Sequence, residues 1–376
     1  MNNFETKTDK EILQKMKDFA IEQINLIDKN IAPKIEFKLR GKNNTVYKKG
    51  YLELGNKTEL RNYNNPSQSK KLAQTLAVMN TVKQQIEAGK TITLRDLFYM
   101  LKIKIGEGID EQVFDEQGES NNVAVDLELI TGHSREQLHL ITNPRAFCVG
   151  NVIAEEVFRG EKQTINFMGG GSAGISIAPN PEVYKFKKVD AKFILFLEKY
   201  AVFQKLNEEN FPNKHKAIII TSSGYPARSG RLFAQRLSSE FKLPTYILTD
   251  ADSDGYNIST TLQVGSMALS WLSEKIAIPN SKFIGLKLTD IENNKDLQYI
   301  KEKHLNMAVS KRDLKKIDIM LGYDWIKNTK YVEELLLMKK LKLKVESDVL
   351  ASKNYEVLEK YILDNIKNKN YIETVK

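Results

Sequence analysis

The sequence predicts an α/β protein of several domains, with a helical unit before a domain built on a parallel sheet. Its 376 residues exceed what one domain usually holds. Apolar side chains over 70–140 recur at helical spacing. From Lys192 onward, short continuous apolar runs alternate with helix-like segments, the pattern of buried parallel strands joined by helices.

Residues 1–69 predict a basic extension made of a helix and a hairpin. The expected elements are a helix over 9–29, a strand over 34–40, a turn at 41–44 and a return strand over 46–54. The polar stretch Asn62–Ser69 contains a proline and marks the expected boundary. Residues 1–71 hold 15 Lys and Arg against 9 Asp and Glu, so most of the net charge of +9 lies near the N-terminus.

Residues 70–150 predict a helix-turn-helix or winged-helix unit. The expected helices cover 70–88, 94–102, 123–130 and 134–140. Thr93 has the position of an N-cap, and Ser134 with Gln137 resembles a capping box. Units of this kind often bind DNA, and a plain helical bundle explains the same pattern.

The remaining segments are linking strands over 151–190 and an α/β domain over 191–376. The loop Gly169–Gly174 is interpreted as a turn, because no Lys-Ser/Thr follows it as in a phosphate-binding loop. The expected strands are 193–198, 217–221, 245–250 and 282–286, the helices between them 199–206 and 229–237, and a mainly helical tail covers 314–366.

Composition excludes several classes of protein. Cys148 is the only cysteine, so neither an internal disulfide nor a cysteine-based zinc site is expected. The N-terminus is polar and of mixed charge, unlike a signal or transit peptide, and no apolar run reaches the roughly 18 residues of a membrane span. We expect a cytoplasmic protein with no membrane contact, and its pI of about 9.1 permits nucleic-acid binding.

Three carboxylates follow two of the predicted strands. Glu198 ends one apolar run, Asp250 ends another, and Asp252 lies two residues further on. Ligands gather at the carboxyl ends of parallel strands, so these side chains are expected to converge. Three hard oxygen donors suit Mg²⁺, with Asp254 as a fourth acid nearby.

This acidic stretch has two other interpretations. D-A-D-S-D-G at 250–255 resembles the start of an EF-hand loop, but Thr261 has the position where that loop needs a carboxylate, and a strand precedes it instead of a helix. An acidic turn without function explains the stretch as well. The pairing with a strand-terminal Glu198 favours a metal site.

Tyr99 in T-L-R-D-L-F-Y is a candidate nucleophile, although a single tyrosine among 15 is usually a packing residue. On a helix, Arg95 and Asp96 share its face. A phenol with a pKa of about 10 is only about one part in a thousand ionised at pH 7, and a guanidinium favours the phenolate and can also hold a phosphate. The pair suits attack on a backbone phosphorus.

Seven stretches together resemble the A subunit of topoisomerase VI, a type IIB DNA topoisomerase, and its relative the meiotic double-strand-break transesterase. They are NPSQSKKLAQTL (65–76), TLRDLFYM (93–100), FDEQGESNNVAVDLELITGHSRE (114–136), FLEKYAVFQKL (196–206), SSGYPARSGRLFAQRL (222–237), LTDADSDGY (248–256) and SEKIAIPNSKFIGLKLTDIE (273–292). They occur in the order of the family and cover most of the chain.

The resemblance implies a fold and an activity. The segment around Tyr99 would be a winged-helix domain of the catabolite-activator type that binds double-stranded DNA, and the C-terminal region a Toprim domain with Glu198, Asp250 and Asp252 as Mg²⁺ ligands. The family acts as a homodimer in which the tyrosine of one protomer meets the metal site of the other. Each tyrosine becomes linked to a 5′ end, and a separate ATPase B subunit operates the gate in an A2B2 assembly.

The sequence departs from the family in the acidic turn. The family usually has a D-P-x-G turn, whereas Ser253 and Asp254 stand at the two middle positions here. Proline fixes φ and stiffens a turn, so its loss predicts a looser Asp252, and Asp254 adds negative charge where a phosphate must lie.

Basic residues after the second α/β strand are candidates for phosphate contacts. Arg228 and Arg231 share a helical face and are predicted to bind DNA with Arg95, or else to form a solvated face, whereas Arg236 turns away. The run Lys339, Lys340, Lys342 and Lys344 is interpreted as solvated surface.

Three functions fit these observations. The first is the DNA-cleaving subunit of a nucleoid-associated type IIB topoisomerase. The second is a stand-alone transesterase that makes double-strand breaks without an ATPase partner. The third is a non-catalytic DNA-binding Toprim protein, which would have no need of Tyr99, Arg95 and the three acids together.

Overall fold

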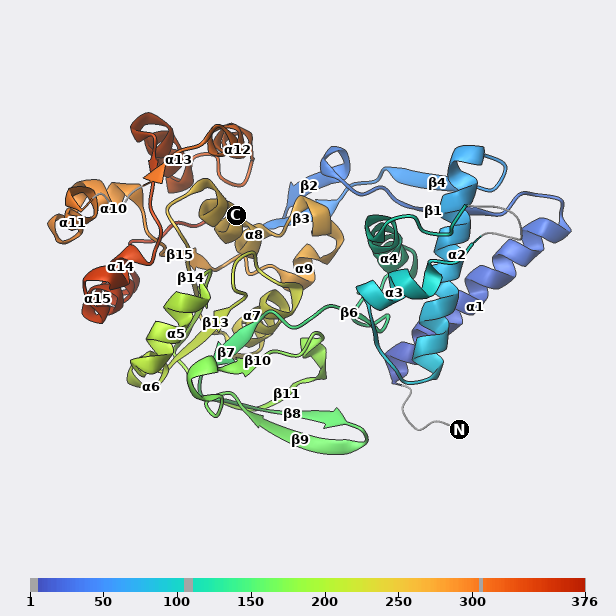
Figure 1. The fold of residues 1–376 in the computed structure, drawn as a ribbon, viewed down its shortest axis with the longest axis horizontal. Coiled ribbons are helices and arrows are strands. Elements are labelled where there is room, and N and C mark those ends of the chain that lie inside the picture. The colour runs from blue at the N-terminus through green and yellow to red at the C-terminus, as the bar shows by residue number, and fades with distance from the viewer. Residues whose placement is uncertain (1–5, 105–110, 304–306, 376) are drawn as a thin grey trace. The chain divides into compact units, whose positions relative to one another are not determined.

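The computed structural model describes residues 6–104, 111–303 and 307–375. Contacts divide the chain into two compact units (Figure 1). The first comprises Met1–Asn44 and Leu54–Asn143, and the second comprises Thr45–Glu53 and Pro144–Lys376. The first unit therefore joins two segments that the sequence predicted as separate, 1–69 and 70–150.

The first unit is mainly helical. Its elements are α1 (Lys7–Asp28), β1 (Lys34–Lys38), η1 (Lys42–Asn44), β4 (Thr58–Asn62), α2 (Pro66–Glu87), β5 (Ile92–Thr93), α3 (Leu94–Leu101), α4 (Gln117–Thr131) and β6 (Leu140–Ile141). Helices α1 to α4 enclose one apolar core, with Ile12, Val82, Leu97 and Leu127 fully buried in it. The predicted helices over 9–29, 70–88 and 94–102 are confirmed within a few residues.

The predicted pairing of the N-terminal hairpin is wrong. Strand β1 pairs antiparallel with β4, and not with residues 46–54. Those residues form their own two strands, β2 (Thr45–Lys48) and β3 (Tyr51–Leu54), within the second unit. The reason is apolar burial: Leu52 joins the larger core of the second unit, and Tyr47 packs against Trp325.

A buried ion pair stabilises the first unit. Arg61 on β4 and Arg40 both contact the carboxylate of Asp126 on α4, and Arg61 also donates to Thr75 Oγ1 at 3.0 Å. Arg61 and Asp126 are almost fully buried. Arg61 Nε also lies 3.1 Å from Glu59 Oε1, so removing Asp126 would leave the buried Arg61 with this single, partly exposed acidic partner.

We expect Asp126→Ala to lower the free energy of unfolding of the first unit by about 2–3 kcal/mol, because the buried Arg61 then keeps only the partly exposed Glu59 as an acidic partner. Urea unfolding followed by circular dichroism measures the change. Asp115→Ala is the matched control, because Asp115 forms an exposed pair with Lys70 and should change stability by less than about 1 kcal/mol. Equal effects of the two substitutions would contradict the prediction.

The predicted helix over 134–140 is also wrong. The capping contacts are present, since Ser134 N–H donates to Gln137 Oε1 at 3.0 Å, but only turns follow. His139 has a positive φ of 60°, which ends the helical path, and Leu140–Ile141 pairs in parallel with Ile92–Thr93 as β6 and β5. Pairing with a distant strand therefore replaces the local helix.

The His139 ring joins three segments of the first unit. Its Nε2 lies 2.9 Å from Asp9 Oδ1 on α1, and its Nδ1 lies 2.8 Å from the Lys90 carbonyl oxygen. Both partners only accept hydrogen bonds, so both ring nitrogens must donate, which requires the imidazolium form. Burial opposes this charge, but the hydrogen bonds to Asp9 and Lys90 outweigh it and raise the pKa of His139.

We expect this contact to make the first unit less stable as the pH rises. A raised folded-state pKa gives stability that is complete below the unfolded value of about 6.5 and is lost as the pH rises through the folded value. Between pH 5.5 and 8.5 the wild type should lose about 1–2 kcal/mol more than His139→Gln, which cannot become charged. Urea unfolding at both pH values tests this, and parallel losses in the two proteins would refute it.

The second unit is built on a six-stranded sheet. Besides β2 and β3, the strands of the second unit are β7 (Phe147–Val149), β8 (Val152–Phe158), β9 (Glu161–Asn166), β10 (Ile175–Ser176), β11 (Lys185–Val189), β12 (Phe193–Leu197), β13 (Ala217–Thr221), β14 (Thr245–Leu248), β15 (Lys282–Phe283), β16 (Met307–Ala308) and β17 (Leu343–Lys344). The order is β10-β7-β13-β12-β14-β15, in which β13, β12, β14 and β15 run parallel. This confirms the four strands predicted for the α/β domain.

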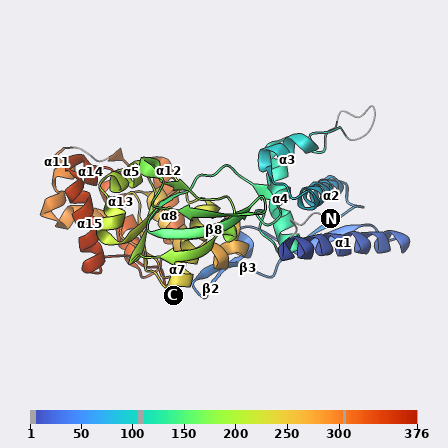
Figure 2. The same cartoon turned by 90° about the horizontal axis from the view of Figure 1, so that it is seen from below.

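Helices cover this sheet. The helices of the second unit are α5 (Tyr200–Glu208), α6 (Phe211–His215), α7 (Arg228–Phe241), α8 (Ser253–Val264), α9 (Ser273–Ile276), α10 (Leu288–Asn293), α11 (Tyr299–Glu302), α12 (Lys311–Leu321), α13 (Lys330–Leu341), α14 (Val349–Lys353) and α15 (Tyr355–Lys367). Its short 3₁₀ turns are η2 (Gly171–Ala173), η3 (Pro181–Val183), η4 (Met267–Leu272) and η5 (Lys295–Leu297). Figure 2 shows α11 and α13 to α15 gathered at one end of this unit. The loop at 169–174 is the predicted turn.

Both faces of the sheet are buried. Residues such as Leu195 and Ile219 face one core, which α5, α13 and α15 complete, whereas Ile194 and Ile218 face a second core with α7 and the β8–β9–β11 sheet. Strands that are covered on both sides consist of continuous apolar residues, and this pattern made them predictable from the sequence. Among the helices of the described residues, none has the length and apolar character that a bilayer crossing requires.

Candidate active site

Helix α3 presents Tyr99 to solvent. Thr93 caps the helix: its Oγ1 accepts from Asp96 N–H at 3.0 Å, and Asp96 Oδ2 accepts from Thr93 N–H at 3.2 Å. Leu97 and Leu101 face the core, whereas 58% of Tyr99 is exposed. The hydroxyl of Tyr99 is therefore not a core packing group, and a substrate can reach it.

Arg95 lies beside the Tyr99 ring. Its guanidinium carbon is 5.8 Å from the centre of that ring, one helical turn away. A hydrogen bond to Tyr99 is the main cause that raises the pKa of Arg95. Asp96, which the sequence placed on the same face, uses its carboxylate in the helix cap instead. Of the three candidate residues on α3, Tyr99 and Arg95 are therefore the two whose side chains contact each other.

Glu198 and Asp250 meet at the carboxyl end of the sheet. Strands β12 and β14 pair in parallel with Leu197 opposite Leu248, so both acids follow at one edge. Glu198 Oε2 accepts from Asp250 N–H at 3.1 Å. Burial raises the pKa of Glu198 to about 8, and the charges of Asp250 and Asp252 add to the rise. The structure thus places Glu198 beside Asp250, with Asp252 near enough for its charge to act on Glu198.

Asp250 is held by contacts from two further segments. Its Oδ1 accepts from the backbone N–H and the hydroxyl of Ser347, at 2.7 and 2.6 Å. Its Oδ2 lies 3.2 Å from Lys199 Nζ, which also pairs with Glu346 and Asp348 at 2.9 and 2.8 Å. These carboxylates outweigh burial and raise the pKa of Lys199. Lys199 is thus a cation fixed beside the acids.

Asp252 caps helix α8 from the same loop. Its Oδ1 accepts from Gly255 N–H at 2.6 Å. Gly255 is needed for this approach, because a Cβ there would lie 2.3 Å from the Asp250 carbonyl oxygen. Burial raises the pKa of Asp252, with smaller rises from Asp250 and Asp254.

The three acids suit a magnesium ion by their chemistry. They are hard oxygen donors on two neighbouring loops at the carboxyl end of the sheet. Burial first, and then the charges of Asp250 and Asp252, raise the pKa of Glu198, and a divalent cation would favour its charged form. Across the part of the chain that the structure describes, no three His, Cys, Asp or Glu side chains already surround a common point for a metal ion. Both carboxylate oxygens of Asp250 have protein partners, Lys199 and Ser347.

Comparison with known proteins identifies the family of this chain. Residues 70–140 match the family described as type IIB DNA topoisomerase, and residues 193–366 match the Toprim domain shared by the topoisomerase 6 A subunit and Spo11. The A subunit of the type 2 DNA topoisomerase 6 of Sulfurisphaera tokodaii is 33% identical over 98% of both chains. The chain belongs to the topoisomerase VI A-subunit family. It is therefore a DNA topoisomerase subunit with a Toprim domain.

Other relatives extend this similarity. The A subunit of the type 2 DNA topoisomerase 6 of Hyperthermus butylicus is 35% identical over 91% of this chain and 90% of its own. The A subunit of the DNA topoisomerase 6 of Arabidopsis thaliana is 30% identical over 82% of this chain and 69% of its own. The two family matches contain Tyr99 and the three acids respectively.

One predicted DNA-binding residue of this topoisomerase subunit is not at the surface. Arg231 on α7 is only 1% exposed, and its Nη2 donates to the Thr261 carbonyl oxygen at 3.1 Å. Burial lowers the pKa of Arg231 to about 10. A direct phosphate contact by Arg231 is therefore wrong for this structure, because its guanidinium lies inside the unit. Arg228, at the start of α7, is not fully buried and stays a candidate.

Sequence analysis did not predict the two residues that contact the Asp250 carboxylate. Ser347 and Lys199 carry no motif of their own, although Lys199 directly follows Glu198. Lys344 was interpreted as part of a solvated run, yet its Nζ lies 3.1 Å from Asp313 Oδ2. Only the adjacency of Lys199 and Glu198 was a usable signal.

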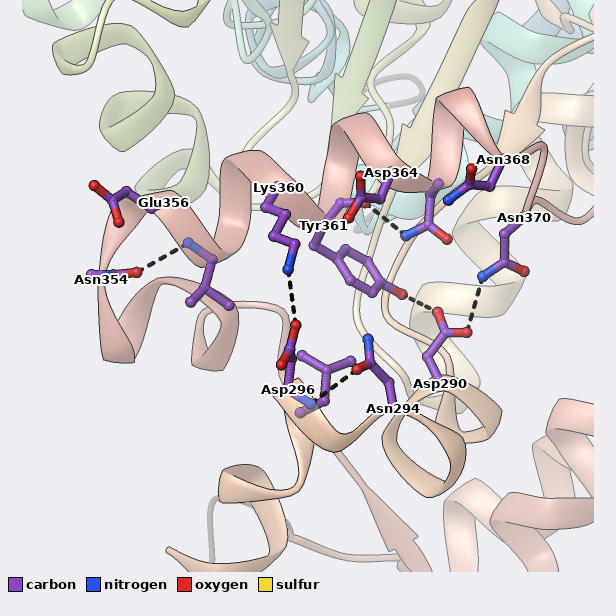
Figure 3. Close-up of a pocket in the computed structure, with 13 residues that line it drawn as sticks. Asp290, Asn294, Asp296, Asn354, Glu356, Lys360, Tyr361, Asp364, Asn368 and Asn370 are labelled. Carbon is purple, nitrogen blue, oxygen red and sulfur yellow. Dashed lines mark hydrogen bonds and ion pairs between the residues drawn. The ribbon is translucent and has the colours of Figure 1, made fainter.

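A polar hollow lies away from the acids, between α10, η5 and α15. Its volume is about 440 Å³, and its lining is rich in carboxylates and amides (Figure 3). These groups contact one another: Lys360 pairs with Asp296 at 2.9 Å, and Asn370 donates to Asp290 at 3.1 Å. None of the three candidate metal ligands lines it.

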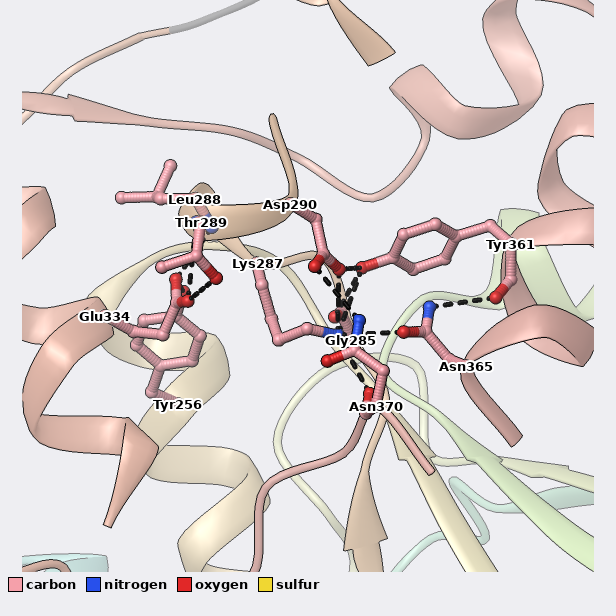
Figure 4. A network of polar contacts seen from close by, with 10 residues as sticks. All are labelled: Tyr256, Gly285, Lys287, Leu288, Thr289, Asp290, Glu334, Tyr361, Asn365 and Asn370. Carbon is pink, nitrogen blue, oxygen red and sulfur yellow. Dashed lines mark hydrogen bonds and ion pairs between the residues drawn. The ribbon is translucent and has the colours of Figure 1, made fainter. Parts of the chain in front are cut away.

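A buried polar network contacts α8 through Tyr256 (Figure 4). Tyr256 of α8 donates to Glu334 of α13 at 2.9 Å, and Glu334 also accepts from Leu288 N–H at 2.7 Å. Lys287 in the same region pairs with Asp290 at 2.9 Å. These contacts fix α8 against α10 and α13, so the helix that Asp252 caps has a firm position.

Proposed function

We propose that the chain cuts and rejoins duplex DNA as the catalytic subunit of a type IIB topoisomerase, with Tyr99 as nucleophile. The observation that carries this proposal is the exposed Tyr99 hydroxyl beside the Arg95 guanidinium, on a helix whose other face is buried. A phenol without a packing role next to a cation suits attack on a phosphodiester.

The reaction we infer is a transesterification. The Tyr99 oxygen forms a bond to phosphorus while the bond from phosphorus to the 3′ oxygen breaks. The phenol loses its proton, the departing 3′ oxygen gains one, and the 5′ phosphate stays on Tyr99. Arg95 supports both the phenolate and the phosphate charge. The reverse reaction restores the DNA strand, so cleavage itself consumes no ATP.

Glu198, Asp250 and Asp252 are the residues that would hold Mg²⁺. The ion would supply charge neutralisation at the scissile phosphate or its neighbour. Lys199 and Ser347 orient the Asp250 carboxylate in the absence of the ion. Arg95 and Arg228 are the proposed phosphate contacts, and the net charge of +9 favours a polyanionic substrate.

The assembly we propose follows from the family. The relatives are named as A subunits, which supports the existence of a second, B subunit. That this subunit is an ATPase and that the complex is A2B2 are parts of the proposal that the family resemblance implies. Two copies of this chain would cut the two strands, each Tyr99 acting with the acids of its partner. Helices α2, α3 and α4 with the antiparallel bridge Lys104–Gln112 would form the winged-helix surface for double-stranded DNA. A nucleoid-associated enzyme in the cytoplasm fits this role.

The test is to trap the covalent intermediate. The chain, with its B subunit, is incubated with labelled duplex DNA and Mg²⁺, denatured with SDS, digested with protease and mapped by mass spectrometry. We expect Tyr99 to carry a nucleotide that is linked to it through the 5′ phosphate. A nucleotide on any other residue, or tight DNA binding without any adduct, would overturn the proposal.

A further inference from the structure

The loop that carries Asp252 lacks the proline that usually stiffens it in this family. Ser253 follows Asp252 and is the first residue of α8. A serine leaves the backbone freer than proline does. The Gly255 N–H contacts the Asp252 carboxylate at 2.6 Å, and a restraint on a residue between them would keep this contact in place.

Ser253 makes a buried hydrogen bond to a distant helix. Its side chain is fully buried, and its Oγ donates to Asp313 Oδ1 at 2.9 Å. Asp313 lies in the first turn of α12, 60 residues further along the chain. Because water does not reach this contact and the acceptor is a carboxylate, the bond is of the strong, charge-assisted kind.

Asp313 is itself firmly fixed. Its Oδ2 accepts from the backbone N–H and hydroxyl of Ser310, at 2.9 and 2.7 Å, and from Lys344 Nζ at 3.1 Å. Although burial works against the charge, these donors and Ser253 hold the pKa of Asp313 well below its usual range. The carboxylate is thus a charged, immobile acceptor for Ser253.

The same helix also contacts the next residue of the loop. Lys316, one turn after Asp313 on α12, pairs with Asp254. On the other side of the loop, Ala251 and Val345 exchange backbone hydrogen bonds of 2.9 and 3.1 Å. The ion pair offsets the extra negative charge of Asp254, and α12 holds two successive residues after Asp252.

We propose that the hydrogen bond from Ser253 to Asp313 fixes the Asp252 carboxylate and replaces the conformational restriction that proline gives. Ser253 and Asp313 are positioning residues, which act through Asp252 and do not touch the substrate. The consequence for metal binding rests on the proposed function, whereas the fixing of the loop does not.

The test compares two substitutions at one position. Neither Ser253→Ala nor Ser253→Pro can donate to Asp313, but proline restricts φ and suits the first position of a helix. Ser239→Ala, on the exposed part of α7, is the control. Hydrogen–deuterium exchange of residues 250–256 in the metal-free full chain is the readout, because the Gly255 amide reports on its bond to Asp252.

We expect exchange over 250–256 to be about tenfold faster in Ser253→Ala and unchanged in Ser239→Ala. Ser253→Pro should stay within about twofold of the wild type, because the backbone restriction is restored. Unchanged exchange in Ser253→Ala would overturn the inference, and this variant decides the point even where the proline variant does not fold. Exchange in a folded Ser253→Pro as fast as in Ser253→Ala would overturn it too.

Magnesium titration by calorimetry separates this inference from the proposed function. Ser253→Ala should weaken Mg²⁺ binding about tenfold, as loss of an outer contact to a ligand does. Asp252→Ala is the reference for loss of the ligand itself. If Asp252→Ala binds Mg²⁺ as the wild type does, the proposed metal role of Asp252 falls, while the exchange result still decides whether Ser253 fixes the loop.

Discussion

Replacing Tyr99 by Phe is expected to abolish covalent protein–DNA adducts while DNA affinity stays within about twofold. The substitution removes one oxygen from a side chain that is mostly exposed, so no core packing is lost. The removed atom is the proposed nucleophile, and loss of a nucleophile typically lowers the rate by about 10⁴ or more. Arg95 remains to contact phosphate, which is why binding should persist.

The measurement is an SDS-trapping assay on labelled duplex DNA, paired with a binding titration at fixed salt. Tyr63→Phe is the matched control, because Tyr63 is also in the first unit and is 61% exposed. It should leave adduct formation unchanged. Adducts that persist in Tyr99→Phe would rule out Tyr99 as the nucleophile, and loss of binding together with adducts would point to a structural role instead.

The parts of the fold that were predictable depend on neighbouring residues. Thr93 is the N-cap of α3 as predicted, and Asp96, three residues on, completes a capping box that was not predicted. The strands β12, β13 and β14 are continuous apolar runs, because both faces of their sheet are covered. In each case the local pattern and the tertiary environment favour the same structure.

The wrong predictions arose where distant contacts determined the structure. Residues 46–54 follow the turn at 41–44 and were predicted as its return strand, but the core that buries Leu52 belongs to the second unit. Residues 134–140 have a capping box, but pairing of β6 with β5 draws the chain out of the helix. Local spacing does not contain the information on which distant partner a segment will find.

In the candidate site, too, local patterns predicted some contacts, whereas contacts between residues distant in sequence were not predicted. Glu198 and Asp250 were predictable as neighbours, because parallel strands end at one edge of a sheet. Ser347 contacts Asp250 across 97 residues of sequence, and Asp313 contacts Ser253 across 60, so no motif links either pair. The burial of Arg231 was likewise invisible, since helical spacing gives a shared face and not its exposure.

Asp250→Asn is expected to remove Mg²⁺-dependent cleavage while the loop keeps its shape. The amide retains an oxygen that can accept from Ser347, so the contacts at 2.6 and 2.7 Å can persist. The charge that would attract the ion is gone. We expect cleavage at saturating Mg²⁺ to fall about 100-fold or more, as loss of several kcal/mol of charge stabilisation implies. Glu198→Gln should act in the same direction.

Asp348→Asn is the control for charge alone. Asp348 also pairs with Lys199, at 2.8 Å, but is not a proposed ligand. Its substitution should therefore leave the Mg²⁺ concentration needed for half-maximal cleavage within about threefold of the wild-type value. Cleavage is measured against Mg²⁺ concentration, with calorimetry of the ion alone beside it. Because Lys199 contacts both carboxylates, equal defects in the two variants would mean that Lys199, and not the ion, supplies the charge at this site. Wild-type cleavage in EDTA would exclude the metal role altogether.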